Sequence, residues 1–276
     1  MTSVPTLISD HLEVALVVSA GLAIAFEMVL LRRWRRAVDY RDVTESMAMG
    51  LVWAGARVVG AKALLFGVLM WTWQHLSLFT IDVHDPRSWV AYWLVGDLLY
   101  YWTHRAEHRI RALWSSHLVH HSSEQFNLAT AVRQPWTEAF YKPFIALWAP
   151  LLGFHPIMGA VVGIVSLAVG QWQHLDWFPR VRALDATVMS PSNHRVHHAR
   201  NQIYLDRNFG GSLVLWDKLF GTYEPEDETP VYGVLHLPLA HSTAGRSLGG
   251  YPELLSDMRH AAGVRSALRL AVGPPR

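Results

Sequence analysis

The sequence contains no cysteine among its 276 residues. This absence excludes disulfide bonds, thiolate metal ligands and a cysteine nucleophile. Charged residues are also scarce, at 17% of the chain, whereas an average soluble domain has roughly 25%. The formal net charge is only +2, so the composition does not indicate a nucleic-acid partner. The chain instead has 51% hydrophobic residues and 13 tryptophans, which is typical of an integral membrane protein.

Four apolar segments are long enough to cross or enter a bilayer. They are residues 12–31, 47–73, 89–103 and 139–172. The first has the length that a helix needs to cross about 30 Å of hydrocarbon. It does not resemble a signal peptide, because no basic region precedes it and no cleavage site follows it. The second is expected to be one helix despite two internal charges. The fourth is interrupted by Pro150, Gly153 and Pro156 and is expected to be a helical hairpin that either crosses twice or re-enters.

Basic residues predict the orientation of these segments. Five arginines lie within residues 32–41, directly after the first segment. In the predicted topology 20 of the 24 lysines and arginines lie on one side, together with every histidine cluster and the C-terminal region. The positive-inside rule makes that side cytoplasmic. Residues 251–270 are expected to form an amphipathic surface helix.

Histidine is the side chain that this sequence concentrates. The clusters are HRAEH at 104–108, HLVHH at 117–121 and HRVHH at 194–198, and one further histidine follows an apolar helix at position 174. Residues three and four apart share a face of a helix, so each cluster can direct its rings to one place. Nine imidazoles exceed the four to six ligands of one metal, so we expect two metals. The candidate ligands are His104, His108, His117, His120, His121, His174, His194, His197 and His198.

All-imidazole ligation suits iron, zinc, copper or nickel better than magnesium or calcium. The other seven histidines are expected to be surface or hydrogen-bonded residues. Carboxylates and amides near the clusters are candidates for outer partners of the ligand rings. We expect Asp97 either to orient a ligand histidine or to pair with Arg57 or Lys62. The full set of outer candidates is Asp97, Glu124, Asn127, Asp176 and Asn193.

These motifs resemble the fatty acid hydroxylase/sterol desaturase superfamily. The resemblance covers roughly residues 90–225 and includes DLLYYWTHRAEH, WSSHLVHHSSEQFN, PSNHRVHH and WDKLFGTYEPE. Within the superfamily, the second and third histidine motifs are most similar to those of the alkylglycerol monooxygenases and their bacterial relatives. The superfamily's ligand pattern falls on the nine candidate histidines. Arg109 departs from it, because the alkylglycerol enzymes tend to have an acid there, and neither Gly170 nor Phe178 supplies a tenth histidine.

The resemblance implies two iron ions that activate dioxygen for attack on a C–H bond of a membrane lipid. Zinc is an alternative occupant in the purified protein. Electrons are expected from a separate donor, because the chain has no GxGxxG fingerprint for a nucleotide cofactor. The alkylglycerol enzymes use a reduced pterin, although no residue here indicates a pterin site.

The sequence therefore predicts an all-α integral membrane protein with about four transmembrane or half-spanning helices and a cytoplasmic histidine-rich di-metal cap. We expect N-terminal membrane helices in residues 1–88, a fatty acid hydroxylase-type catalytic domain in 89–225 and a cytoplasmic tail in 226–276. The predicted function is an iron-dependent lipid monooxygenase, with an alkylglycerol-type ether lipid as a candidate substrate. The alternatives are a sterol desaturase or methyl oxidase, a carotenoid or ornithine-lipid hydroxylase, a metal transporter and a zinc hydrolase.

Overall fold

The computed structural model describes residues 4–59, 62–236 and 242–275, with side chains for residues 15, 17–56, 65–236 and 242–275. Those residues fold into helices joined by loops, and within them the only β-type pairings are two isolated bridges, Val188 with Leu213 and Ala199 with Tyr232. The prediction of an all-α fold is confirmed. The helices are α1 (Val4–Arg33), α2 (Tyr40–Val59), α3 (Lys62–Leu76), α4 (Pro86–Arg109), α5 (Arg111–His121), α6 (Leu128–Val132), the 3-10 helix η1 (Trp136–Phe140), α7 (Lys142–Ile145), α8 (Trp148–Leu151), α9 (Pro156–Gln173), α10 (Arg182–Asp185), α11 (Pro191–His198), α12 (Leu215–Leu219), α13 (Thr243–Arg246), α14 (Tyr251–Arg259) and α15 (Val264–Val272).

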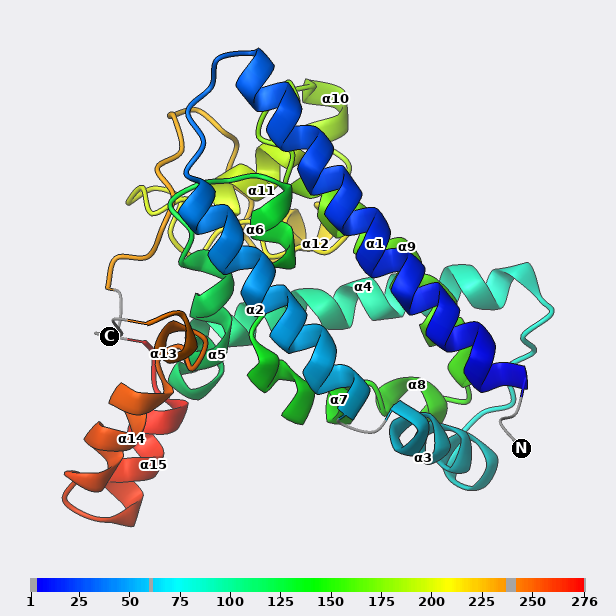
Figure 1. The fold of residues 1–276 in the computed structure, drawn as a ribbon. Coiled ribbons are helices and arrows are strands. Elements are labelled where there is room, and N and C mark those ends of the chain that lie inside the picture. The colour runs from blue at the N-terminus through cyan, green and yellow to red at the C-terminus, as the bar shows by residue number, and fades with distance from the viewer. Residues whose placement is uncertain (1–3, 60–61, 237–241, 276) are drawn as a thin grey trace.

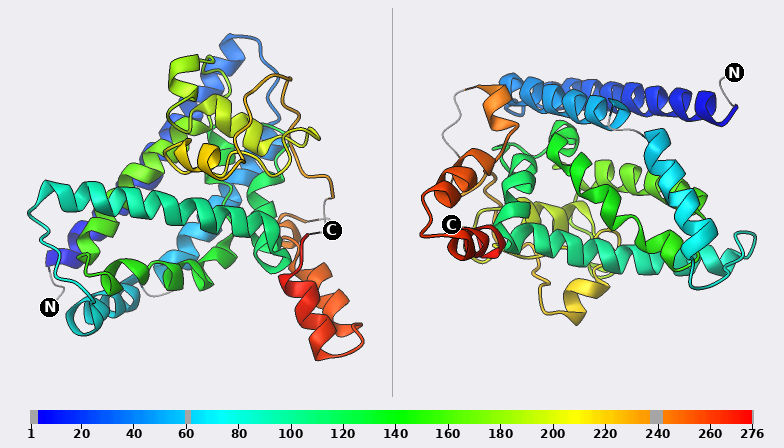
Figure 2. Two further views of the ribbon diagram at one scale, coloured as in Figure 1. Left: turned by 180° about the vertical axis from the view of Figure 1, so that it is seen from behind. Right: turned by 90° about the horizontal axis from the view of Figure 1, so that it is seen from below.

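The longest helices are α1, α2, α4 and α9 (Figure 1), and the histidine clusters lie on α4 and on the shorter helices α5 and α11. The short helix α6 packs against α1, α2 and α9, and α4 packs along α5. The α14–α15 pair projects from the main body beside α5 (Figures 1 and 2), so the expectation of one helix over residues 251–270 is wrong: a turn separates two helices there. The chain therefore gathers segments far apart in sequence around one interior region.

The expectation of a single helix over residues 47–73 is wrong. The structure has α2 and α3 as separate helices, and residues 60–61, between them, lie outside the described part of the chain. The two helices pack on different partners: α2 on α6 and η1, and α3 on α8 and α9. Figure 1 shows that α2 and α3 run in different directions, so they do not form one straight helix. The side chains of Arg57 and Lys62, which interrupt this segment, also lie outside the described residues.

The predicted hairpin at residues 139–172 has two unlike arms. The first arm is a succession of η1, α7 and α8, whereas the second is the single 18-residue helix α9. Gly153 makes the turn with φ of +96°, and a Cβ there would collide with the backbone carbonyl of Phe79. Only glycine adopts this conformation cheaply and allows the close backbone approach.

Among the residues searched, α9 is the one helix with the length and hydropathy to cross a bilayer. Only 17% of this segment is buried inside the protein, and Val161, Val165 and Leu167 are exposed on it. Exposed apolar side chains also lie along α1, including Leu22 and Phe26. The expectation of about four spanning or half-spanning helices stays a prediction.

A buried arginine joins the outer helices to the interior. Arg133, at the end of α6, is 1% exposed and donates hydrogen bonds to Asp42 and Ser46 of α2 at 2.8 and 3.1 Å. A buried charge is tolerated only when it is paired in this way. The Arg133 backbone carbonyl faces the other way and accepts a hydrogen bond from His120 Nδ1 at 3.1 Å. Helix α2 thus helps to fix one of the candidate ligands.

Candidate metal centre

Three helices and one helix end carry the nine candidate ligands to the interior. Helix α4 ends with the first two, α5 ends with the next three, His174 caps the C-terminus of α9, and α11 holds the last three. Helix α11 is fixed in place by its own N-terminus, where the Ser190 side chain accepts a hydrogen bond from the Asn193 amide and Pro191 occupies the first turn. Such a start is favourable for a short helix.

The histidines form two groups, each of which could hold one metal ion. The five-histidine group consists of His104, His108, His117, His121 and His197. The four-histidine group consists of His120, His174, His194 and His198. Within each group the candidate ligand atoms all lie within 4.8 Å of one another. The structure therefore brings together all nine histidines that the sequence singled out and divides them between two positions.

The two groups adjoin each other. The rings of His121 and His198, one from each group, stack with centroids 4.2 Å apart. Inside the five-histidine group, His117 Nε2 lies 3.1 Å from His104 Nε2 and 3.2 Å from His121 Nε2. These nitrogen atoms come from two helices, α4 and α5, and they converge on one point. This arrangement is suited to a pair of neighbouring metal ions.

The donor set passes a chemical test for metal binding. Several ring nitrogens are fully buried and have no hydrogen-bond partner among the described residues: His108 Nε2, His174 Nε2, both nitrogens of His194, His197 Nε2 and His198 Nε2. A buried polar atom without a partner costs about 1–3 kcal/mol. Several such nitrogens lie in one cluster, so the free-energy cost of burying them must be offset by something that binds them. A metal ion at each group would bind them, so the residues present fit two metals.

Backbone carbonyls orient four of the rings. His104 Nδ1 faces the Phe209 carbonyl at 3.0 Å, and His197 Nδ1 faces the Arg207 carbonyl at 2.9 Å. His120 and His174 face the carbonyls of Arg133 and Gly170 in the same way. A carbonyl can only accept, so each of these neutral rings carries its proton on Nδ1 and leaves Nε2 free as a ligand atom.

Burial lowers the pKa of all nine imidazoles, and neighbouring imidazoles lower the pKa of most of them further. For His174, which follows the last residue of α9, burial lowers the pKa to about 4. The rings are therefore neutral at physiological pH, and the neutral ring is the form that binds metal. The rings themselves therefore add no positive charge that would oppose a bound cation.

The outer candidates that the sequence suggested hold loops rather than rings. Asp97 accepts hydrogen bonds from the Ser212 and Leu213 amides and from Trp216 Nε1, and none of its described contacts is with a ligand histidine. The reason is topological. The segment after Asn208 folds back over α4, so its backbone amides lie within hydrogen-bond distance of the Asp97 carboxylate. The alternative partners, the side chains of Arg57 and Lys62, lie outside the described residues.

None of the other four outer candidates has a described hydrogen bond to an imidazole. Asn127 caps α6, Asp176 pairs with Arg36, and the Asn193 side chain donates to backbone carbonyls of residues 185 and 188. Glu124 is exposed. Among the remaining histidines, His75, His155, His236 and His260 have hydrogen-bond partners outside the two groups, His84 lies in an exposed turn, and the side chains of His11 and His241 lie outside the described residues.

Three carboxylates that were not among those candidates lie beside ligand rings. His117 Nδ1 is 3.6 Å from Glu107 Oε2 and 3.8 Å from Glu138 Oε1, and His108 Nδ1 is 3.7 Å from Asp206 Oδ1. Glu107 stands within the first histidine motif, which was the available sequence signal. Glu138 and Asp206 reach the cluster only through the fold, so no local pattern marks them.

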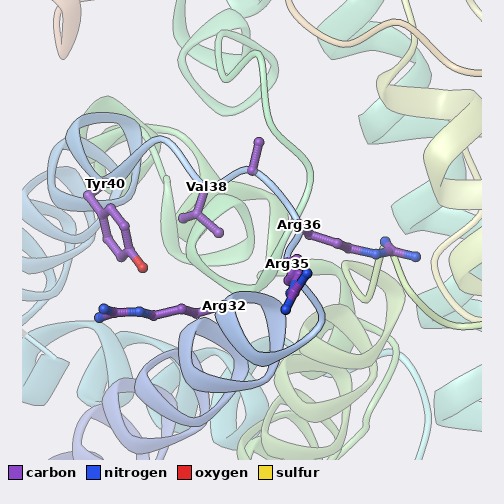
Figure 3. A pocket seen from close by; sticks show the side chains of 6 residues that line it. Arg32, Arg35, Arg36, Val38 and Tyr40 are labelled. Atoms are coloured by element: carbon purple, nitrogen blue, oxygen red, sulfur yellow. The ribbon is translucent and has the colours of Figure 1, made fainter.

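A surface pocket of about 500 Å³ lies at the end of α1 (Figure 3). Its lining residues are Arg32, Arg35, Arg36, Ala37, Val38 and Tyr40. The pocket contains none of the nine histidines, although Arg36 donates a hydrogen bond to Asp176, two residues beyond His174. It is therefore a basic surface feature and not the opening of the metal centre.

Comparisons with known proteins agree with this geometry. Residues 89–222 match the fatty acid hydroxylase family model, and this range contains all nine histidines. The chain is 38% identical to human alkylglycerol monooxygenase over 60% of its own length and 37% of the human protein. It is 36% identical to the Danio rerio alkylglycerol monooxygenase over 72% of its length and 44% of that protein.

A bacterial relative has a different name. The chain is 29% identical to the ornithine lipid hydroxylase OlsE of Rhizobium tropici, over 68% of this chain and 58% of that protein. The chain spans about half or less of the alkylglycerol monooxygenases that it matches. No solved structure matches it.

Proposed function

Residues 89–222 of this chain belong to the fatty acid hydroxylase family, and from that premise we propose that the protein is a membrane-bound di-iron oxygenase that uses dioxygen to hydroxylate a C–H bond of a lipid. The observation that carries the proposal is the division of nine buried, neutral histidines into adjoining groups of five and four. Two bound iron ions would supply the activation of dioxygen. The protein's part is to hold the rings in place, keep them neutral and exclude water from them.

The names of the relatives favour an ether lipid as the substrate. An alkylglycerol-type reaction places a hydroxyl group on the carbon beside the ether oxygen, and the resulting hemiacetal collapses to an aldehyde and a glycerol derivative. One oxygen atom enters the product and the other leaves as water, so two electrons and two protons must come from a donor. We assign them to a separate donor, with a reduced pterin as one candidate. The second substrate candidate is an ornithine-type lipid, which the similarity to OlsE favours.

The position of Glu107 argues against a zinc hydrolase. A hydrolase needs a general base beside the open position of the metal. Here Glu107 accepts a hydrogen bond from Tyr141 and lies on the Nδ1 side of His117, while His117 Nε2 points into the cluster. The carboxylate is therefore behind a ligand ring, where a metal-bound water is out of its reach.

The first test of this function is the requirement for iron and dioxygen. Detergent-purified protein loaded with iron is expected to convert 1-O-alkylglycerol to aldehyde in air with a reductant, and turnover is expected to stop in anaerobic buffer. Zinc-loaded protein is the matched control and is expected to be inactive, because zinc has no redox chemistry. Ornithine lipids and sterols are assayed in parallel by mass spectrometry. Turnover without dioxygen, or with zinc alone, would rule out the oxygenase.

We also propose that the histidine side of the molecule faces the cytoplasm. The exposed apolar residues of α1 and α9 would contact lipid, and the arginines of the Figure 3 pocket would lie at the headgroups. Helix α15 presents Val264, Leu268 and Val272 on one exposed stripe. With basic residues at Arg265 and Arg269, this helix suits the cytoplasmic membrane surface.

A reporter fusion tests this topology. A reporter fused after Arg276 is expected to give a cytoplasmic signal, because most basic residues lie on that side. A second reporter inserted between α3 and α4, at residues 77–85, serves as the control and is expected to give the opposite signal. Equal signals at the two positions would overturn the proposed arrangement.

A further inference from the structure

Behind the ring of His117 lies a charged cluster that the ligand pattern does not use. It consists of Glu107 on α4, Glu138 on η1, Tyr141, and Lys142 on α7. Glu107 is 2% exposed and Glu138 is 3% exposed. Burial of two carboxylates is costly unless they are paired. Their position thus calls for an explanation beyond surface solubility.

The internal contacts of the cluster account for part of its charge. Lys142 Nζ lies 2.7 Å from Glu138 Oε1 and 3.7 Å from Glu107 Oε1, and Tyr141 donates a hydrogen bond of 2.7 Å to Glu107 Oε1. The single ammonium group of Lys142 therefore pairs with two carboxylates, so the cluster keeps a net charge of about −1. The ammonium already lies beside both acids, so a third metal ion between them would meet like charge.

The remaining charge faces a ligand ring. His117 Nδ1 is buried without a hydrogen-bond partner among the described residues, and it lies 3.6 and 3.8 Å from the two carboxylates. The opposite nitrogen of the same ring points at His104 and His121. A neutral ring that gives Nε2 to a metal carries its proton on Nδ1, toward the carboxylates.

We propose that Glu107 and Glu138 are positioning residues that hold His117 through Nδ1 and make the five-histidine metal site more electron-rich than the four-histidine site. The inference rests on the two-metal centre proposed above. A second carboxylate contact, Asp206 with His108, is also in the five-histidine group. In the four-histidine group, by contrast, the oriented rings of His120 and His174 face uncharged backbone carbonyls. The two metals would therefore differ in affinity and electronic structure.

The test measures metal release, so that it does not depend on turnover. Full-length protein in detergent is loaded with Co²⁺, whose visible spectrum reports its ligands, and titrated with a chelator. Wild type is expected to release its two ions in two phases. The Glu107→Gln, Glu138→Gln double variant is expected to weaken one ion by about 10–100-fold and leave the other unchanged, as for other outer partners of ligand histidines. On iron-57 loading, one of two Mössbauer doublets should shift.

Three further variants separate positioning from general damage. Glu107→Asp keeps the charge and should restore part of the affinity. Tyr141→Phe removes the hydrogen bond to Glu107 Oε1 but keeps both carboxylates, and it should have a smaller effect. Glu45→Gln changes another buried carboxylate, 8% exposed, whose partners are arginines, and it should leave both release phases unchanged.

The outcomes distinguish the two proposals. Identical release curves for wild type and the double variant would overturn the inference, even if dioxygen-dependent turnover is found. Loss of one phase in a protein without dioxygen-dependent turnover would support the inference and contradict the oxygenase. If the double variant loses both release phases, and the separate Glu45→Gln variant does so as well, the role of these carboxylates is merely structural. That result would also overturn the inference.

Discussion

Replacing His198 by Ala is expected to remove one of two metal ions per chain and to lower turnover by more than the roughly 100-fold that loss of an outer partner costs. His198 belongs to the four-histidine group, so the variant leaves three ligands there. His197→Ala is the matched change in the five-histidine group and leaves four ligands. We therefore expect His197→Ala to retain more metal than His198→Ala while losing comparable activity, because both ions are needed. Metal content by mass spectrometry and turnover on the same preparations provide the measurement.

The control for these variants is His236→Ala. His236 is exposed, and its only described partner is Glu253 at 3.3 Å. This change should leave metal content and turnover at the wild-type level. Full metal content and turnover in His198→Ala would contradict the division into five and four.

The convergence of the nine candidate histidines could be predicted from the sequence because its geometry is local. Residues spaced by three and four on a helix share a face, and α4, α5 and α11 end with such spacings. His174 has no partner within its own segment, but its place after the apolar helix α9 put it at the right depth. Which rings share a metal was not predictable. The five-histidine group draws on three helices, and their relative rotation is decided by packing.

The outer residues of the site could not be predicted for the same reason. A search for nearby polar residues along the chain found Asp97 and Asn193, which hold loops. The groups that orient the rings are mostly backbone carbonyls, such as those of Phe209 and Gly170, and every residue has one. Composition and motif carry no information about them. Glu138 approaches His117 only because η1 packs against the helices around it.

The apolar segments show a further limit of sequence analysis. Apolar length alone suggested one helix over residues 47–73 and a regular hairpin over 139–172. The structure replaces the first with α2 and α3 and makes one arm of the second from η1, α7 and α8. The hydropathy of a segment does not depend on whether its helix is broken or continuous. The break is decided by which neighbouring helices each part packs against, and the sequence does not give those neighbours. In the described residues, α9 alone has both the length and the hydropathy of a span.

Asp97→Ala is expected to destabilise the protein strongly, although Asp97 touches no ligand. Its carboxylate accepts hydrogen bonds of 2.6, 3.1 and 2.9 Å from the Ser212 amide, the Leu213 amide and Trp216 Nε1. Alanine would leave these donors without an acceptor, at about 1 kcal/mol or more each. The free energy of unfolding should fall by about 3 kcal/mol, which corresponds to a decrease in Tm of roughly 5–10 °C. Thermal unfolding in detergent measures this change.

The loss should extend to the metal centre. The segment that Asp97 anchors follows directly on Phe209, whose carbonyl orients His104 at 3.0 Å. A loosened segment would release that ring, so part of the metal should be lost below the new Tm as well as above it. Asp97→Asn keeps the size but turns an NH₂ group toward an N–H donor, so it should also destabilise, to a smaller extent. Asp82→Ala, at an exposed turn, is the control and should leave Tm unchanged. A wild-type Tm and full metal content in Asp97→Ala would show that α4 does not hold this segment.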